Sequence, residues 1–311
     1  MSTFISVIVP LYNEEPVIDE LYKRLTSVLS LYEDRYEIIF VNDGSRDNTL
    51  GLARQLCLQD KKVKLINFSR NFGHQASLTA GMDKASGEVI VTIDADLQDP
   101  PEVIPEMVKR WEEGYPVVHG VRKKRKGEGI FRHAAIYLFY QFLRKTANID
   151  ITVDSGDFRL MDRRVVEELK KMREKNRYIR GMVSWVGFRQ TEVVYVRERR
   201  FAGETKYPFR KLVKLAVDGI LSFSRFPLHA SMAMGFFSTL VSLAFLLGAL
   251  IITCSSPDKA VQGWLFAFLL VWFLGGVQLI TIGILGLYVV RMYEQTNERP
   301  IYITEDLVNF E

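Results

Sequence analysis

The sequence lacks the glycine-rich signatures of the commonest nucleotide-binding folds. Its first strand-to-helix turn has no G-x-G-x-x-G, which excludes an ordinary dinucleotide-binding fold. It has no G-x-x-x-x-G-K-[ST] either, which excludes a P-loop nucleotidase. The chain has only two cysteines, Cys57 and Cys254, and they lie in segments of quite different character. We therefore predict neither a disulfide nor a cysteine-based metal site.

The net charge is small, and charged residues are missing altogether from two long stretches. The 311 residues carry a formal net charge of +4, which is too small to indicate a nucleic-acid partner. The N-terminus has no basic segment before its first apolar run, so we predict no cleaved signal peptide. Residues 228–254 and 260–290 contain no Asp, Glu, Lys or Arg. A membrane helix needs about 20 apolar residues, so we predict a transmembrane hairpin.

Basic residues gather beside these two spans. They crowd the segment from Arg197 to Arg225, and Arg291 follows the second span. By the positive-inside rule, we predict an integral membrane protein whose two termini, and so the whole domain ahead of the spans, are cytoplasmic. Residues 209–226 have amphipathic helical spacing and are predicted to form a juxtamembrane helix. Residues 130–143, rich in aromatics and flanked by basic residues, fit either a membrane-surface helix or a docked core helix.

Ahead of the spans, short runs rich in β-branched residues alternate with helical segments. Strands are predicted at 4–11, 36–41, 63–68, 89–93 and 117–121. This alternation predicts an α/β domain with a mostly parallel, Rossmann-like sheet covered by helices on both faces. Further along, we predict a polar loop at 154–161, a helix at 165–172, a strand at 189–196 and a mobile basic loop at about 197–207.

Polar side chains follow several of the predicted strands. The run at 89–93 ends in Asp94-Ala95-Asp96, and Gln98 follows. Residues two apart in an extended chain point the same way, and open α/β sheets bind ligands at the carboxyl edge. Two carboxylates with a third oxygen donor suit Mg²⁺ or Mn²⁺ held together with substrate phosphates. The alternative is a capped turn, because Asp is common before helices.

Three motifs, taken together, resemble the inverting GT-A-fold glycosyltransferases of family 2. They are FISVIVPLYNEE at 4–15, VNDGS with DNT at 41–49, and DADLQDPP at 94–101. More narrowly, the chain resembles the polyisoprenyl-phosphate glycosyltransferases, which include dolichyl-phosphate mannose synthase and the bactoprenol glucosyltransferases. The resemblance implies a cytoplasmic GT-A domain at 1–208 with an acceptor loop at about 197–207. Transmembrane helices would follow at 228–254 and 260–290, and a cytoplasmic tail at 291–311.

The resemblance also assigns roles to residues. It implies that the nucleoside is held by Pro10, Tyr12, Glu14 and Asp43. It implies that Mg²⁺ or Mn²⁺, bridging the donor diphosphate, is bound by Asp94, Asp96 and Gln98, with Asp96 also counted as catalytic. Asp157 takes the place of the family's proposed base on the acceptor side. The lipid phosphate or the leaving diphosphate is contacted by Arg122, Arg132, Arg200 and Lys206.

The implied partners are a nucleotide sugar, a lipid phosphate and the membrane. UDP-glucose as donor and polyprenyl (undecaprenyl) phosphate as acceptor are the first expectation, with GDP-mannose or a UDP-aminoarabinose-type donor as alternatives. We expect no nucleic-acid partner and a homo-oligomer, taken as a tetramer. A phosphate monoester has its second pKa near 6, so the acceptor needs little deprotonation at pH 7. Asp157 therefore has two open roles, as a base or as a group that orients the acceptor.

Two other functions are disfavoured. A processive polysaccharide synthase would share the first half of the chain, but the Q-x-x-R-W motif of those enzymes and their additional membrane spans are absent. A non-catalytic membrane scaffold that kept a nucleotide-binding domain is disfavoured by the intact pair Asp94 and Asp96 and by Asp157.

Overall fold

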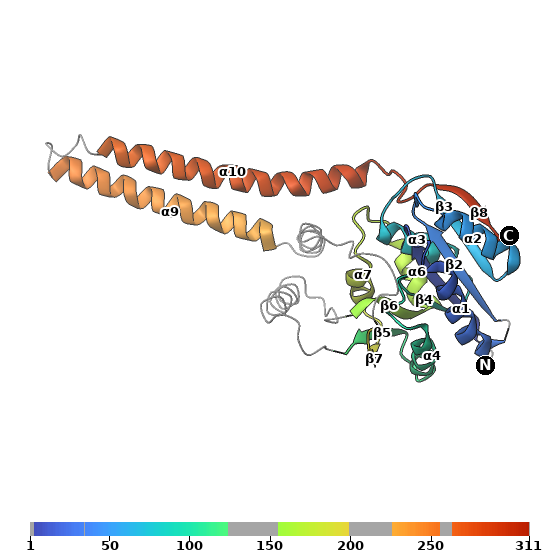
Figure 1. Ribbon diagram of the computed structural model, residues 1–311. Coiled ribbons are helices and arrows are strands. Elements are labelled where there is room, and N and C mark those ends of the chain that lie inside the picture. The colour runs from blue at the N-terminus through green and yellow to red at the C-terminus, as the bar shows by residue number, and fades with distance from the viewer. Residues whose placement is uncertain (1–2, 34, 124–154, 199–225, 256–262, 311) are drawn as a thin grey trace. The chain divides into compact units, whose positions relative to one another are not determined.

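The computed structural model describes residues 3–33, 35–123, 155–198, 226–255 and 263–310. The chain forms two compact units (Figure 1). The first combines Met1–Ala216 with Pro300–Glu311, and the second is Val217–Arg299. The candidate site lies entirely in the first unit, which is therefore described in more detail.

A mixed eight-stranded sheet forms the first unit, with the strand order β7-β5-β6-β4-β1-β2-β3-β8. The strands are β1 (Ile5–Leu11), β2 (Tyr36–Asn42), β3 (Val63–Phe68), β4 (Val89–Thr92), β5 (Val117–Arg122), β6 (Ser155–Asp162), β7 (Gln190–Tyr195) and β8 (Thr304–Val308). The helices are α1 (Ile18–Leu29), α2 (Thr49–Gln59), α3 (His74–Lys84), α4 (Ile104–Glu112), α6 (Arg163–Lys171) and α7 (Ile179–Trp185). The described residues of this unit also contain two short 3₁₀ turns, η1 (Ser30–Tyr32) and η2 (Pro101–Val103). The predicted α/β class is confirmed.

Helices cover both faces of the sheet because the central strands are apolar on both sides. Strand β1 is fully buried at Val7, Ile8 and Val9, and it pairs in parallel with β2 and β4. Val7 and Val9 belong to the core cluster that includes residues of α1, α2 and α4. Ile8 faces α3 instead, where Gly81 has no side chain to keep the helix away. Helix α3 is thereby held close to β1.

Strand β6 corrects the polar loop predicted at 154–161. It runs antiparallel between β4 and β5, with Thr92 opposite Arg159 in one pairing and His119 opposite Arg159 in the other. The pattern was misleading because charged side chains are buried here: Arg159 is 1% exposed and Asp157 is 7% exposed. Each is paired with an opposite charge, as described below. The antiparallel direction brings the amino end of β6 to the edge where the parallel strands end.

Strand β8 gives the C-terminal segment a structural role for which no strand was predicted. It pairs antiparallel with β3 at the edge of the sheet. Its acidic side chains hold it in place, because Arg54 of α2 donates to Asp306 at 2.8 Å and Asn67 of β3 donates to Glu305 at 3.0 Å. The end of the chain is thus part of the sheet unit.

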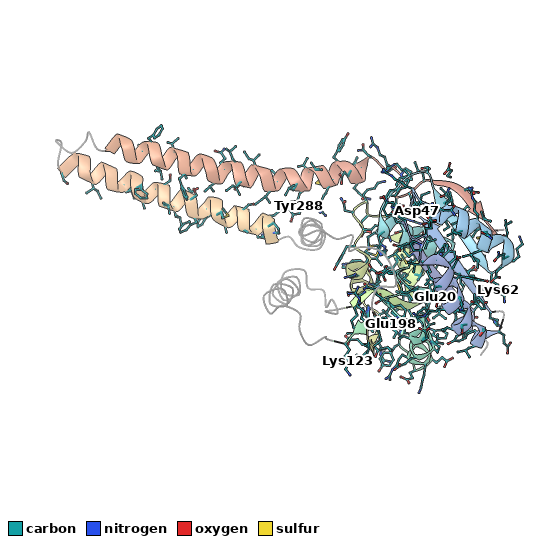
Figure 2. The ribbon with its side chains drawn as sticks, viewed as in Figure 1. Glu20, Asp47, Lys62, Lys123, Glu198 and Tyr288 are labelled. Carbon is teal, nitrogen blue, oxygen red and sulfur yellow. The ribbon has the colours of Figure 1, made fainter. Side chains whose placement is uncertain are left out.

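The described residues of the second unit form two long apolar helices, α9 (Phe226–Ser255) and α10 (Gly263–Thr296), which pack side by side. Stretches at Pro227–Phe245 and Phe273–Thr296 are long and apolar enough to cross a membrane. Large apolar side chains project outward along both helices (Figure 2), with Phe236 68% exposed and Leu279 72% exposed.

The predicted amphipathic helices at 130–143 and 209–226 lie outside the described residues, apart from Phe226 at the start of α9.

Candidate active site

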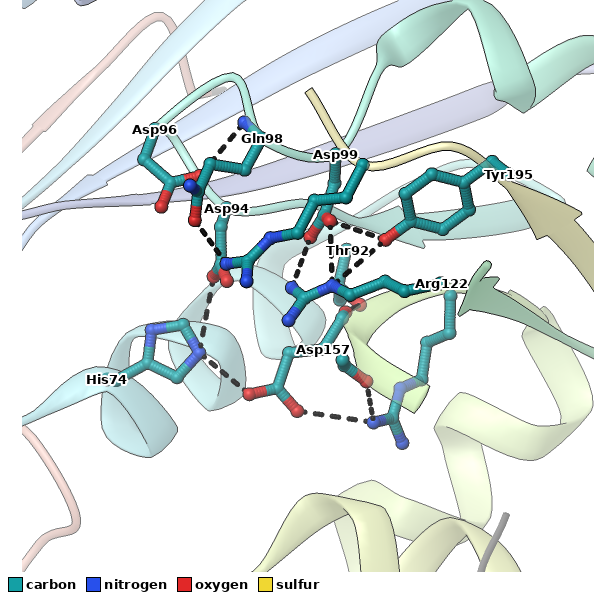
Figure 3. Close-up of polar contacts among 12 residues, drawn as sticks. His74, Thr92, Asp94, Asp96, Gln98, Asp99, Arg122, Asp157 and Tyr195 are labelled. Atoms are coloured by element: carbon teal, nitrogen blue, oxygen red, sulfur yellow. Dashed lines mark hydrogen bonds and ion pairs between the residues drawn. The ribbon is translucent and has the colours of Figure 1, made fainter. Parts of the chain in front are cut away.

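Charged side chains on or next to β4, β5, β6 and α3 meet at one edge of the sheet (Figure 3). Asp94 and Asp96 follow β4, Arg122 ends β5, and Asp157 is the third residue of β6. His74 is the first residue of α3, directly after the loop that leaves β3. The edge is therefore the carboxyl end of the parallel strands, where open α/β sheets bind their ligands.

The carboxylate pair after β4 is held by a tight turn. Leu97 has a positive φ of 57°, and the backbone amide of Gln98 donates to Asp96 Oδ1 at 3.1 Å. The side chain of Asp94 is 34% exposed. Burial and the neighbouring carboxylates of Asp157, Asp99 and Asp96 raise the pKa of Asp94 to about 6, against the opposing effect of His74. Crowded carboxylates of this kind are relieved by a cation.

The donor set suits a cation that shares its ligands with a substrate. Among the described residues, no group of three His, Cys, Asp or Glu side chains is arranged to hold a metal ion. Asp94 and Asp96 supply two carboxylates, and the remaining positions around a cation would be left for water and substrate oxygens. Mg²⁺ binds in this manner, through one or two carboxylates plus phosphates. These residues fit the predicted Mg²⁺ or Mn²⁺.

Gln98, the predicted third ligand, has another partner in the structure. Its amide oxygen accepts a hydrogen bond from the guanidinium of Arg197, which lies just beyond β7. Its backbone oxygen accepts from the amide of Glu198 at 3.1 Å. Gln98 therefore ties the carboxylate turn to the chain that follows β7, and its role as a metal ligand stays a prediction.

Asp157 is surrounded by three basic side chains. It accepts hydrogen bonds from Arg180 Nε at 3.0 Å, Arg159 Nη2 at 3.2 Å and His74 Nε2 at 3.1 Å. Burial alone would raise the pKa of this carboxyl, but the charges of Arg180, His74 and Arg159 hold it well below its usual range. A carboxylate with so low a pKa is a poor proton acceptor near neutral pH. The surroundings favour an orienting role over that of a base.

His74 links the two halves of the site. Its Nε2 lies 3.1 Å from Asp157 Oδ2 and 3.6 Å from Asp94 Oδ1. Burial alone would lower the pKa of His74, but the bond to Asp157 and the charge of Asp94 raise it to about 9. The imidazole is therefore protonated at neutral pH and donates to Asp157. Sequence reasoning assigned His74 no role, although it follows a predicted strand, as the other site residues do.

The residues predicted to hold the nucleoside lie on neighbouring loops. Ser45 Oγ accepts from the amide of Asn13 at 3.0 Å, and Thr49 Oγ1 accepts from the amide of Glu14 at 2.9 Å. The loops after β1 and β2 are thereby joined. Pro10 is half-buried on β1, and Tyr12 is 36% exposed at its end.

Asp43 is the most buried of the predicted nucleoside residues, at 4% exposed. Its carboxylate accepts from the backbone amides of Phe72 at 2.6 Å and Gly73 at 3.0 Å, and from Asn71 Nδ2 at 2.9 Å. Burial raises the pKa of Asp43, and the backbone hydrogen bonds oppose that rise. The loop between β3 and α3 therefore sets the position of this carboxylate.

Arg122 is paired within the protein. Its guanidinium donates to Asp99 Oδ2 at 3.0 Å and to the hydroxyl of Tyr195 at 3.3 Å, and Asp99 is fully buried. The side chain of Arg122 is 27% exposed, so part of it faces solvent at the site edge. The other predicted phosphate contacts, Arg132, Arg200 and Lys206, lie outside the described residues.

Several side chains of the site were missed at the sequence level: Asp99, Arg159, Arg180, Tyr195 and Arg197. Asp99 lies within a motif that was singled out, and its burial beside Pro100 could have marked it as structural. The others come from the second half of the first unit, where no pattern in the sequence distinguishes them from surface charges.

Comparison with known proteins decides the family. The profile of Glycosyl transferase family 2 matches residues 6–170. The chain belongs to glycosyltransferase family 2. It is 47% identical over 300 residues to the uncharacterized glycosyltransferase YkcC of Bacillus subtilis (strain 168), covering 96% of this chain and 93% of the relative. The protein is therefore a glycosyltransferase, as the motifs predicted.

Other relatives bear names that specify an acceptor. The chain is 41% identical over 303 residues to the bactoprenol glucosyl transferase of Shigella phage SfV, covering 97% of this chain and 98% of the relative. The prophage bactoprenol glucosyl transferase homolog of Escherichia coli (strain K12) is 42% identical over 300 residues, with 96% and 97% covered. The resemblance to the polyisoprenyl-phosphate branch is thus confirmed over nearly the whole chain.

Proposed function

We propose that this glycosyltransferase moves glucose from UDP-glucose onto a polyprenyl phosphate, such as undecaprenyl phosphate, at the cytoplasmic face of a membrane. The observation that carries the proposal is the pairing, through His74, of the Asp94 and Asp96 turn with Asp157. One side of this arrangement suits a sugar diphosphate with its cation, and the other suits an anionic acceptor. The names of the bactoprenol relatives support the same pair of substrates.

In the proposed reaction, an oxygen of the lipid phosphate forms a bond to the anomeric carbon while the bond to the UDP oxygen breaks. Attack from the side opposite the leaving group inverts the configuration. Mg²⁺ or Mn²⁺ held by Asp94 and Asp96 would offset the charge that grows on the departing diphosphate. Arg180 and His74, beside Asp157, would offer positive charge to the dianionic acceptor phosphate.

Asp157 would orient these cations instead of accepting a proton. Its low pKa and its contacts with Arg159 and Arg180 hold both guanidinium groups in place. Because the acceptor phosphate is already largely dianionic at pH 7, no strong base is required. Preorganised charge of this kind lowers the barrier without moving during the reaction.

Helices α9 and α10 would anchor the enzyme beside its lipid substrate. Both carry stretches long and apolar enough to cross a membrane. With the basic residues from Arg197 to Arg225 on the cytoplasmic side, both termini and the sheet unit would be cytoplasmic. A homo-oligomer, taken as a tetramer, would enlarge the membrane bundle.

The proposal is tested with membranes that contain the full chain, undecaprenyl phosphate and one radiolabelled donor at a time: UDP-glucose, UDP-aminoarabinose or GDP-mannose. We expect label from UDP-glucose in the lipid phase, and loss of that label when EDTA removes the divalent cation. Asp96→Asn should lose transfer as well. Glu168→Gln is the control, because it removes an exposed carboxylate from helix α6, where Glu168 pairs with Lys171.

The possible outcomes distinguish the identity of the donor, the role of the carboxylate pair and the presence of catalytic activity. Label from GDP-mannose or UDP-aminoarabinose alone would change the donor and keep the acceptor. Transfer that persists in EDTA and in Asp96→Asn would overturn the role of the carboxylate pair. Absence of transfer from every donor, with folded protein in the membrane, would favour a non-catalytic scaffold.

A further inference from the structure

The loop of residues 69–73, between β3 and α3, determines where the Asp43 carboxylate points. Asn71, Phe72 and Gly73 all donate hydrogen bonds to that carboxylate. Asn71 also donates to the backbone oxygen of Asp43 at 3.1 Å. Any displacement of the 69–73 loop therefore moves the hydrogen-bond donors of Asp43.

The loop and the Asp43 turn are in close contact. A β-carbon at Gly44 would lie 2.6 Å from the backbone nitrogen of Asn71, well inside van der Waals distance. Gly44 also has a positive φ of 64°, which glycine adopts without strain. The two loops therefore pack backbone against backbone, so movement in one is passed to the other.

The C-terminal segment fastens the 69–73 loop from outside the nucleotide motifs. Tyr302 stacks on Phe68, with ring centroids 5.1 Å apart and an interplanar angle of 17°. Phe68 in turn meets Phe72 edge to face at 5.6 Å. The amide of Ser69 donates to the backbone oxygen of Ile303 at 3.1 Å. Strand β8 continues this contact along β3 (Figure 1).

Tyr302 itself is held firmly. Its hydroxyl donates to Asp83 Oδ2 at 3.0 Å, and Asp83 accepts both arms of the Arg173 guanidinium at 2.9 and 3.0 Å. Asp83 lies near the end of α3, so Tyr302 connects the far end of that helix to the aromatic pair at its start. The ring of Tyr302 is thus fixed by a hydrogen bond on one side and by stacking on the other.

We infer that Tyr302 is a positioning residue for the nucleoside site, acting on Asp43 through Phe68 and Phe72. The inference rests on the proposed function, because Asp43 is taken there as a nucleoside contact. Along the chain, Tyr302 lies about 200 residues after the last sequence motif of the donor site, which ends at residue 101. The structure nevertheless joins it to Asp43 through the ring contacts of Phe68 with Tyr302 and Phe72, and through the hydrogen bond from the Phe72 amide to the Asp43 carboxylate.

The effect should fall on donor binding and spare the catalytic step. His74 follows the 69–73 loop directly, but α3 is fixed independently by its own buried face. Ala76 and Leu78 are buried, and Gly81 lies against Ile8 of β1. Loss of Tyr302 should therefore loosen the loop on the Asp43 side while His74 keeps its contact with Asp157.

The test compares Tyr302→Ala, Tyr302→Phe and the control Phe310→Ala in the full chain. Phe310 belongs to the same C-terminal segment, and its ring lies under Lys64 Nζ at 5.3 Å, beyond the other end of β8. An aromatic pair is worth enough to change an equilibrium by about three- to tenfold. We expect Tyr302→Ala to raise the KM for donor by that factor, with kcat and the KM for acceptor unchanged. Tyr302→Phe keeps the stack and should remain near the unsubstituted protein.

A second measurement does not depend on any substrate. Hydrogen exchange at the amides of Phe72 and Gly73, which donate to Asp43, should accelerate in Tyr302→Ala and not in Phe310→Ala. Unchanged exchange at these amides would overturn the inference. A fall in kcat with unchanged donor KM would also overturn it, because it would indicate a merely structural role. If the unsubstituted protein transfers no sugar, the proposed function fails, while the exchange measurement still decides the coupling of Tyr302 to Asp43.

Discussion

The imidazole of His74 is hydrogen-bonded to the carboxylate of Asp157 at 3.1 Å, although 83 residues separate them in the chain. The same nitrogen lies 3.6 Å from Asp94 Oδ1. One protonated side chain thus stands between the carboxylate that would bind the cation and the carboxylate on the acceptor side. Its positive charge reduces their mutual repulsion and keeps both carboxylates ionised.

Replacing His74 should therefore weaken catalysis through loss of charge. We expect His74→Gln to lower kcat by about 10- to 100-fold, since removing a preorganised charge at a reacting centre typically costs this much or more. His74→Lys restores a cation near the same place and should recover a substantial part of the rate. The measurement is initial-rate kinetics at saturating donor and acceptor. Equal losses in the two variants would show that imidazole geometry matters and charge does not.

Asp157→Asn should abolish transfer while leaving donor binding nearly intact. The substitution removes the negative charge that organises Arg159, Arg180 and His74, so the acceptor side loses its geometry. A misplaced group at a reacting centre can cost about 100-fold or more in rate. The measurement pairs kcat with calorimetric binding of UDP in the presence of Mn²⁺. If the variant retains most of its turnover, Asp157 does not orient the groups that receive the acceptor.

Folding must be checked in the same variant. Arg159 is 1% exposed, and removing one partner of a buried ion pair destabilises a protein by about 3–5 kcal/mol. Arg180 and the backbone oxygen of Gly156 remain as neighbours of the altered site. UDP binding at the unsubstituted affinity would show that the sheet unit is folded and that the loss concerns transfer alone.

The half of the site proposed to bind the donor could be located from the sequence because its residues follow apolar strands in simple order. Strands β1, β2 and β4 are buried along their length, so their ends are visible in the sequence as abrupt changes to polar residues. Asp43, Asp94 and Asp96 stand at these changes, and parallel topology brings them to one edge. Hydrophobic pattern and turn chemistry were sufficient there.

The acceptor half was less predictable because its burial depends on paired charges. Strand β6 buries Asp157, Arg159 and Asp162, which a pattern-based reading takes for a solvated loop. Strand β8 is short and acidic, and it is stabilised by partners such as Arg54 that are distant in sequence. No motif in the sequence around Arg180 marks it as a site residue, since only the tertiary fold brings it to Asp157.

Gly81 should tolerate no side chain. A β-carbon there would lie 2.3 Å from Ile8 Cγ2, on a helix packed against the centre of the sheet. We expect Gly81→Ala to destabilise the protein by about 1–3 kcal/mol, as overpacked cores do. Thermal unfolding of the full chain in detergent measures the loss. Adding Ile8→Ala makes room for the new methyl group, so the double variant should unfold at a higher temperature than the sum of the two single losses predicts.

His119 should make the sheet unit sensitive to acid. It is 3% exposed on β5, its Nε2 lies 2.7 Å from Gln190 Oε1, and it stands opposite Arg159 across the strand pair. Burial and the charge of Arg159 lower the pKa of His119 from 6.5 to about 4. The unfolded chain therefore takes up a proton near pH 6.5, and the folded chain does so only near pH 4. Stability is lost as the pH falls through that window.

The size of the effect follows from the shift in the pKa of His119. A fall in this pKa from 6.5 to about 4 corresponds to a loss of about 3 kcal/mol in the free energy of unfolding once the pH is below 4. We expect the melting temperature of the unsubstituted protein to fall more between pH 7.5 and pH 5 than that of His119→Gln, which has no proton to gain. His229→Gln, in helix α9, is the control and should follow the unsubstituted protein. Parallel melting curves for His119→Gln and the unsubstituted protein would place the acid sensitivity in other groups.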